Sequence, residues 1–128
     1  MGNRAVLEIQ DTNIGIYLHW NGGRNSVQAF LDVAKEYDVR TSEGEWDNYS
    51  TARLVQIIGN FFGGTLSVGI GPIERMDTDN FDNGVYVIDG NFNIVERKFV
   101  RNPEQTTPSV EEMKGAIKEA NDKFFESK

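Results

Sequence analysis

The sequence predicts an α+β fold: a small antiparallel sheet of two hairpins plus a central strand, two packed helices and a C-terminal helix. Two pairs of short apolar runs, each joined by a turn rich in Asp, Asn or Gly, indicate the hairpins. Longer segments between and after these runs repeat apolar residues every three or four positions, which is the period of a helix.

The first hairpin is expected over Ala5–Ile9 and Ile14–Trp20, because residues 11–13 have the Asp-Thr-Asn composition of a turn. A helix should follow the next glycines and end near Tyr37 or Asp38. Apolar residues at helical spacing mark its buried face, and they are Val27, Phe30, Leu31 and Ala34.

A second helix is expected to begin near Asn48 or Ser50 and to end at Gly63 and Gly64, where glycine permits a left-handed cap. Apolar and small residues then alternate over Thr65–Ile70, which predicts the central strand. The small residues of this strand leave room for a molecule to approach one face. The apolar face of the second helix is formed by Ala52, Val55, Ile58 and Phe62.

The second hairpin is expected over Val85–Ile88 and Phe92–Phe99. A C-terminal helix should begin at the capping box of Ser109 and Glu112. We expect one domain over 1–128, in which the linker and helix of 101–128 either complete the core or pack on another subunit. The apolar stripe of this helix is Val110, Met113, Ile117, Ala120 and Phe124.

The composition restricts the function. A chain of 128 residues can bury a core of its own, and the lack of cysteine excludes thiol catalysis and thiolate metal sites. A formal net charge of −7 argues against binding to a nucleic-acid backbone, which needs clustered cations. No apolar run approaches the roughly 20 residues of a membrane span, so we expect a soluble intracellular protein with no membrane partner.

A glycine turn between the first hairpin and the first helix has the features of an anion site. Gly22 and Gly23 would let the backbone approach a ligand, the first amides of the helix would point outward, and Arg24 would add a cation. The alternative is an ordinary turn with Asn25 or Ser26 as the N-cap of the helix.

No enzyme motif is evident, so we expect a protein that is not an enzyme and that needs no cofactor. His19 lies in a predicted strand without a neighbouring nucleophile, which is typical of a structural histidine. The acidic residues Asp77, Asp79 and Asp82 resemble a calcium loop, but the closing glutamate is missing. We therefore expect a solvated loop and no metal site.

Aromatic rings and side-chain amides around the second hairpin favour a site for a flat purine, which needs stacking and hydrogen bonds at its edge. The rings are Phe81, Tyr86 and Phe92, of which the last two also suit the core of their strands. Guanidinium groups match phosphate oxygens but are also common surface charges. The candidate phosphate contacts are Arg24, Arg53, Arg75 and Arg97.

Four distinctive blocks lie between Gly2 and Phe99: GNRAV, NIGIYLHWNGGRNSVQAFL, ARLVQIIGNFFGGTLSVGIG and DNFDNGVYVIDGNFNIVERKF. Together they resemble small proteins carried by phages and mobile elements of Gram-positive bacteria, and in particular the first-described Thoeris anti-defence family. Its members act as sponges for cyclic ADP-ribose isomers made by TIR-domain immune enzymes. The resemblance implies a small sheet with helices, and homo-oligomers with ligand pockets between subunits.

The resemblance also implies site residues. In that family an aromatic ring and an asparagine ten residues later clamp the adenine, and Phe81 and Asn91 have this spacing. Arg53 is the preferred phosphate contact of the main pocket. The C-terminal helix offers Lys114 and Lys118 where the family uses arginines, so a second nucleotide site is in doubt. The implied function is sequestration of a cyclic ADP-ribose-type signal, without cleavage, in the cytoplasm of a bacterial host cell.

Two other functions remain open. The first is an acidic inhibitor that blocks a host defence protein by direct contact, as many anti-CRISPR proteins do, with the Asp-rich loop of 71–83 as a mimic of a nucleic-acid backbone. The second is a slow phosphodiesterase, which is disfavoured because the sequence lacks a cluster of metal ligands.

Overall fold

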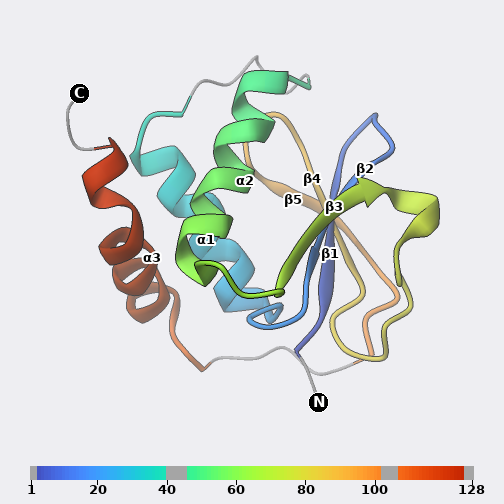
Figure 1. Ribbon diagram of the computed structural model, residues 1–128. Helices are drawn as coiled ribbons and strands as arrows, with labels where there is room; N and C mark the ends of the chain where they lie inside the picture. The colour runs from blue at the N-terminus through green and yellow to red at the C-terminus, as the bar shows by residue number, and fades with distance from the viewer. Residues whose placement is uncertain (1–2, 40–45, 102–106, 126–128) are drawn as a thin grey trace.

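In the described part of the chain, three α-helices cover one face of a five-stranded sheet (Figure 1). This computed structural model describes residues 3–39, 46–101 and 107–125. The predicted α+β class is confirmed. Among the described helices, none combines the length and the apolar character that a membrane span requires.

The strand order in the sheet is β3-β2-β1-β4-β5. β1 (Ala5–Ile9) pairs antiparallel with β2 (Ile14–Leu18) and parallel with β4 (Val85–Ile88), and β4 pairs antiparallel with β5 (Ile94–Lys98). β3 (Val68–Pro72) lies antiparallel to β2 at one edge. Both hairpins are confirmed. The sheet is mixed rather than antiparallel, however, and the strand predicted to be central is an edge strand.

The burial of β1 agrees with its central place in the mixed sheet. Ala5, Val6 and Leu7 are all fully buried, so both faces of β1 are covered. Its two edges pair with β2, antiparallel, and with β4, parallel. Apolar periodicity predicts which face of a strand is buried but not which strand pairs with it or in which direction.

The three predicted helices are present as α1 (Arg24–Glu36), α2 (Asn48–Phe62) and α3 (Val110–Phe125). Asp47 caps α2, because its side chain accepts hydrogen bonds from two backbone N–H groups of the first turn. Gly63 ends α2 with a φ of 68°, so the predicted glycine stop is confirmed.

The predicted capping box begins α3. Ser109 Oγ accepts a hydrogen bond from the backbone N–H of Glu112 at 3.1 Å, and Glu112 Oε1 accepts one from the N–H of Ser109 at 3.0 Å. The helix packs on α1 and α2 of its own chain. Its apolar stripe ends differently from the prediction, because Phe125 is buried and Phe124 is half exposed. The buried residues of α3 are Met113, Ile117, Asn121 and Phe125.

Asn121 joins α3 to α2 inside the core. Its side-chain amide donates to the carbonyl oxygens of Ile57 at 3.1 Å and Ile117 at 2.9 Å, and its oxygen accepts from Asn60 at 2.8 Å. A fully bonded buried amide favours one position of the helix over others. A role of α3 in oligomerisation stays a prediction, and most of the predicted linker, residues 102–106, lies outside the described residues.

Charged and polar groups hold α3 against the end of α1. Glu36 forms ion pairs with Lys114 and Lys118, and these lysines lower the pKa of its carboxyl group. The hydroxyl of Tyr37 donates to Asp122 at 2.5 Å. Burial and this hydrogen bond raise the pKa of Tyr37. α3 is therefore fixed from two sides, by Asn121 in the core and by Glu36 near the surface.

The second face of the sheet is covered by the segment after β3, which includes a short 3₁₀ helix, η1 (Ile73–Arg75). Side chains of this segment pack on a small apolar cluster that is separate from the main core. The cluster consists of Val6, Val85 and Val87, with Tyr17, Ile73 and Met76 against it.

Acidification should loosen the attachment of α3. Because the pKa of Glu36 is lower in the folded chain, its contribution to stability is complete above the unfolded pKa of about 4.3 and is lost as the pH falls through the folded value. We expect Glu36→Gln to lower the free energy of unfolding by less than about 1 kcal/mol at neutral pH, and by a smaller amount at about pH 3. Urea unfolding at both pH values tests this.

The matched control is Glu74→Gln, since Glu74 is exposed in η1 on the other face of the sheet. It should leave the free energy of unfolding within about 0.5 kcal/mol of the wild-type value at neutral pH. A Glu36→Gln effect of equal size at both pH values would contradict the assignment.

Candidate binding groove

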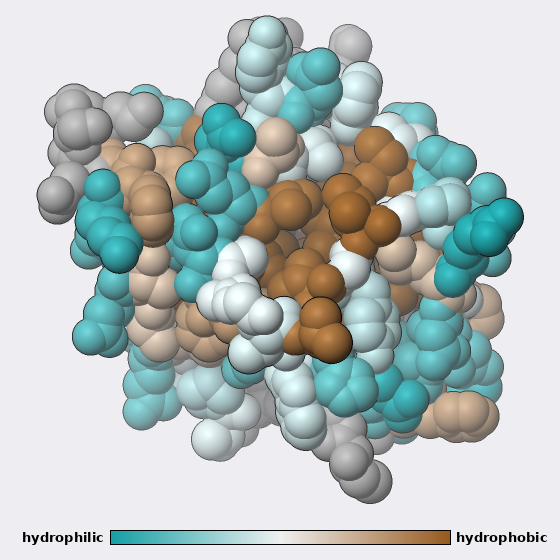
Figure 2. All heavy atoms as spheres, in the orientation of Figure 1, coloured by the Kyte–Doolittle hydropathy of each residue, from teal (hydrophilic) through white to brown (hydrophobic). Residues whose placement is uncertain are grey.

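An apolar groove with a volume of about 380 Å³ lies between α2 and the β2–β3 side of the sheet. α2 packs mainly on α1 and α3, so another of its faces is left open beside the sheet edge. Figure 2 shows apolar side chains gathered there, over α2 and β3. We call this feature the α2–β3 groove. Its walls include Ile14, Trp46, Thr51, Ala52, Val55 and Ile70.

A second hollow, of about 410 Å³, continues the groove along the end of β3. The two hollows share Ile14, Thr51 and Ile70, and the second adds Gly71 and Pro72. Together they form an elongated depression rather than an enclosed cavity. This shape suits a flat group or an extended chain better than a compact ligand that must be surrounded.

Two large apolar side chains of the groove are exposed. The exposed fraction is 60% for Ile70 and 45% for Trp46. Scattered apolar residues are common on protein surfaces, but neighbouring ones around a hollow mark an interaction site. Burying one such side chain contributes about 1.5–3 kcal/mol, so these two residues alone can supply useful affinity.

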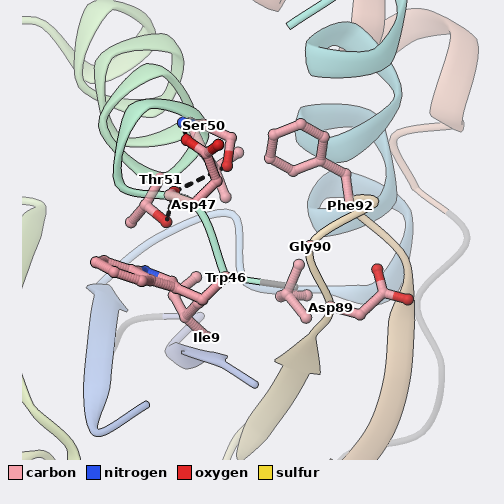
Figure 3. Close-up of a pocket in the computed structure, with 10 residues that line it drawn as sticks. Ile9, Trp46, Asp47, Ser50, Thr51, Asp89, Gly90 and Phe92 are labelled. Carbon is pink, nitrogen blue, oxygen red and sulfur yellow. Dashed lines mark hydrogen bonds between the residues drawn. The ribbon is translucent and has the colours of Figure 1, made fainter. Parts of the chain in front are cut away.

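The N-terminal cap of α2 directly follows Trp46. Asp47 Oδ1 accepts from the N–H groups of Tyr49 at 2.8 Å and Ser50 at 3.1 Å, and the carbonyl oxygen of Asp47 accepts from the hydroxyls of Ser50 and Thr51 at 2.9 Å each. Figure 3 shows Trp46 directly before this cap, beside Thr51. Trp46 therefore adjoins a capped helix end.

A smaller hollow lies on the other side of the α2 cap, at the carboxyl ends of β1 and β4 (Figure 3). Such strand ends are frequent ligand sites in α/β sheets. This hollow has a volume of about 10 Å³, which holds at most one water molecule. We therefore assign the candidate site to the α2–β3 groove. The labelled lining residues are Ile9, Trp46, Asp47, Ser50, Thr51, Asp89, Gly90 and Phe92.

The described residues that line the groove are uncharged. None of the described residues that line the two hollows carries a charge, although 26% of the chain is charged. A phosphate or carboxylate buried there would find no cation among those residues, and burying an unpaired charge costs several kcal/mol or more. The groove therefore favours apolar and aromatic groups.

The glycine turn is part of the packing rather than an open cradle. Gly22 and Gly23 are both buried, the Tyr86 hydroxyl donates to the Gly22 carbonyl at 2.7 Å, and the Gly22 N–H donates to the Asn3 carbonyl at 2.8 Å. The N-cap of α1 is Gly23, so the predicted cap at Asn25 or Ser26 is wrong.

Two of the four arginines predicted to contact phosphate, Arg24 and Arg53, are not among the residues that line the groove. Arg24 donates to Gln28 at 2.8 Å along α1. Arg53 is exposed on α2 and is not among the residues that line the α2–β3 groove. A role of either in ligand binding stays a prediction that this geometry does not favour.

Phe81 and Asn91 lie at opposite ends of β4. Phe81 precedes this strand and Asn91 follows it, so about 13 Å of strand separates them within one chain. Phe81 is 70% exposed, has a φ of 63°, and lies below the guanidinium of Arg101 at 5.5 Å. The predicted adenine clamp is therefore not formed inside one chain and would need Phe81 and Asn91 from different chains.

The acidic loop is largely paired with arginines of the same chain. Arg4 Nε lies 2.8 Å from Asp82 Oδ2, and Arg4 Nη1 lies 3.9 Å from Asp77. Arg101 holds Asp79 through two contacts of 2.8 and 2.5 Å, which lower the pKa of Asp79. These pairs reduce the negative charge that the loop presents, so they weaken its resemblance to a nucleic-acid backbone.

His19 has structural neighbours. Its Nδ1 lies 2.9 Å from the Tyr17 hydroxyl, and its ring lies edge-on to Trp20 with centroids 5.0 Å apart. Within the described residues, no three His, Asp or Glu side chains come close enough to hold a metal ion.

The sequence interpretation missed the groove as a site. Trp46 carries a signal, because it is the one large apolar residue of the polar segment 40–48. Ile70 carries a weaker signal, since its strand alternates with glycines. The open side of β3, however, is the side of Val68 and Ile70, whereas Gly69 faces Tyr17 across the ladder. Which side would be left open depends on where α2 lies, and periodicity does not encode this.

Comparisons of the chain with family models, curated proteins and solved structures gave no match.

Gly22→Ala should destabilise the fold. A Cβ there would lie 2.5 Å from the Asn3 carbonyl oxygen and 2.8 Å from the Ala5 Cβ, and the backbone cannot yield easily. We expect a loss of about 1–3 kcal/mol in the free energy of unfolding, measured with denaturant. The control Gly59→Ala, in a helix with no atom within 4 Å of the new Cβ, should gain up to about 1 kcal/mol. Equal stability of the two variants would refute a packing role for the turn.

The exposed groove residues should contribute little to stability. Ile70 and Ile16 are direct partners across β3 and β2, but Ile16 is fully buried. We expect Ile70→Ala to cost less than about 1 kcal/mol and Ile16→Ala about 2–5 kcal/mol in urea unfolding. Similar losses for both would mean that Ile70 belongs to the core and that the groove is closed in solution.

Proposed function

We propose that the protein inhibits a defence protein of a bacterial host by direct, non-catalytic contact, with the α2–β3 groove as the contact surface. The observation that carries this proposal is the exposure of Ile70 and Trp46 around an uncharged hollow in a chain with a net charge of −7. The anti-defence context follows from the sequence resemblance.

The composition of the groove favours a protein as the target. Protein interfaces have an apolar centre, enriched in aromatic residues and poor in charges, within a polar rim. The groove has this composition, with Trp46 and Ile70 exposed and charged residues elsewhere on the chain. Nucleic-acid mimicry by the loop is a weaker basis, because Asp79 and Asp82 already contact Arg101 and Arg4.

Sequestration of a cyclic ADP-ribose-type nucleotide is the second candidate. The half-exposed indole of Trp46 supports it, since an adenine ring can stack there. The nucleotide phosphates would need cations from outside the described lining of the groove. A homo-oligomer would supply them if the pocket lay between subunits, and it would also be needed to bring Phe81 of one chain to Asn91 of another.

The groove can be tested in cells. The protein is co-expressed with a Thoeris system, and the plating efficiency of a phage that this system restricts is measured. Wild type should restore plating, whereas Ile70→Lys should reduce the restored plating by about tenfold or more, because a buried unpaired charge weakens the contact. Val95→Lys is the matched control, since Val95 is 46% exposed on β5, at the other edge of the sheet.

Equal activity of the two lysine variants would exclude the groove as the contact surface.

A separate measurement addresses the nucleotide: purified protein is incubated with a cyclic ADP-ribose isomer, and the melting temperature is recorded. A rise that Trp46→Ala abolishes, with intact nucleotide recovered after heating, would replace the protein target by the nucleotide. No rise would leave direct contact as the explanation of plating.

A further inference from the structure

The register of β3 determines which of its backbone groups point away from the sheet. His19 directly follows β2, and Ser67 directly precedes β3. The backbone N–H of His19 donates to the carbonyl oxygen of Ser67 at 2.9 Å. In an antiparallel ladder, hydrogen-bonded pairs alternate with pairs that are not bonded to each other. Gly69, two residues on, therefore bonds to β2, whereas Val68 and Ile70 direct their N–H and C=O groups outward.

The same two residues turn their side chains toward the helix layer. Val68 lies opposite Leu18, and Ile70 lies opposite Ile16, and both partners are fully buried on the helix side. Side chains alternate along a strand, so a chain added at this edge would place every second side chain on the same side. Those side chains would enter the α2–β3 groove while the added backbone bonds to Val68 and Ile70.

The two edges of the sheet differ in how well they are protected against pairing with another chain. Exposed edges are usually protected by charged residues, proline or bulges. β5 has Glu96, Arg97 and Lys98, and its pairing with β4 contains an irregularity of register. β3 lies in the uncharged segment 54–73, and its proline, Pro72, removes only the outward N–H at the last position of the strand. β3 is therefore the edge that is suited to accept another strand.

We propose that β3 accepts an extended segment of the inhibited protein as a sixth strand. This inference rests on the proposed function and specifies how the partner is held. The segment spans about five residues, to match β3, and has uncharged apolar side chains at alternate positions, to match the groove. Basic residues at its ends complement the net charge of −7 on this chain.

A second copy of this chain is the competing occupant of the edge. Its own β3 would bring a further net charge of −7 to the interface, and the like charges of the two chains repel each other. The charge therefore favours a partner of another sequence, and self-association becomes one of the outcomes of the test.

The test uses the whole protein and a set of short synthetic peptides in which valine alternates with threonine between terminal lysines. Amide hydrogen exchange is followed residue by residue with and without peptide. Exchange at Val68 and Ile70 should slow by about tenfold or more, because their N–H groups become bonded. Exchange at Gly69 should stay as it is, since its N–H group is bonded to β2 in both states.

Two controls separate strand addition from apolar contact alone. Peptides of the same sequence with N-methyl groups at alternate residues cannot bond to the edge and should bind about tenfold more weakly or worse. Val68→Pro removes an outward N–H at a residue that is not among those lining the two hollows, and it should weaken peptide binding to a similar extent. Val95→Pro, at the irregular position of the other edge, should leave peptide affinity unchanged.

Each contrary result has a distinct meaning. If no peptide of the set binds, or if methylated peptides bind equally well, strand addition is wrong. The proposed function is retained in that case if Ile70→Lys still reduces inhibition in cells, because the groove can contact the target without strand addition. If Val68 and Ile70 become protected without peptide as the protein concentration rises, the edge pairs with a second copy and the proposal is overturned.

Discussion

The burial of β1 on both faces is the constraint on which the rest of the structure depends. Ala5 and Leu7 contact the helix layer, while Val6 belongs to the cluster under the segment after β3. The helices must cover the centre of the sheet to bury β1 and β4, and three short helices do not extend fully over its β3 side. The α2–β3 groove is thus a consequence of how the core is built. It does not need a loop or lid of its own, and its walls are held by the same contacts that stabilise the domain.

The sequence was sufficient to predict local structure, but it was insufficient to predict which elements lie next to one another in the fold. The capping box at Ser109 and the stop at Gly63 were predictable, because hydrogen-bonding groups and φ angles are local properties. The parallel pairing of β1 with β4 was not, since it depends on a contact between residues about eighty positions apart. The same reason explains why the sequence did not predict the groove. Phe81 and Asn91 are close in sequence, but β4 separates them. Trp46 and Ile70 are farther apart in sequence, but they line the same groove.

Ion pairs within the chain reduce the negative charge that its surface presents to a partner. A net charge of −7 suggests an acidic surface for a basic partner, yet Asp79, Asp82 and Glu36 contact arginines or lysines of the same chain. Exposed pairs of this kind add little stability, but they reduce the local field and fix the side chains. The remaining charge acts over longer distances, where it steers association and opposes self-association. Short-range recognition then falls to the uncharged groove.

An edge strand without charged residues, beside an apolar groove, is a liability unless something is bound there. Ile70 and Trp46 could be replaced by polar residues with little loss of packing, and a lysine on β3 would protect the edge at small cost. β5 shows that the chain accommodates charged residues on an edge strand. The different treatment of the two edges therefore cannot be attributed to the demands of folding. Proteins that retain exposed apolar residues against this aggregation risk usually do so because those residues bind something, and this asymmetry is the strongest physical reason to look for the partner at β3.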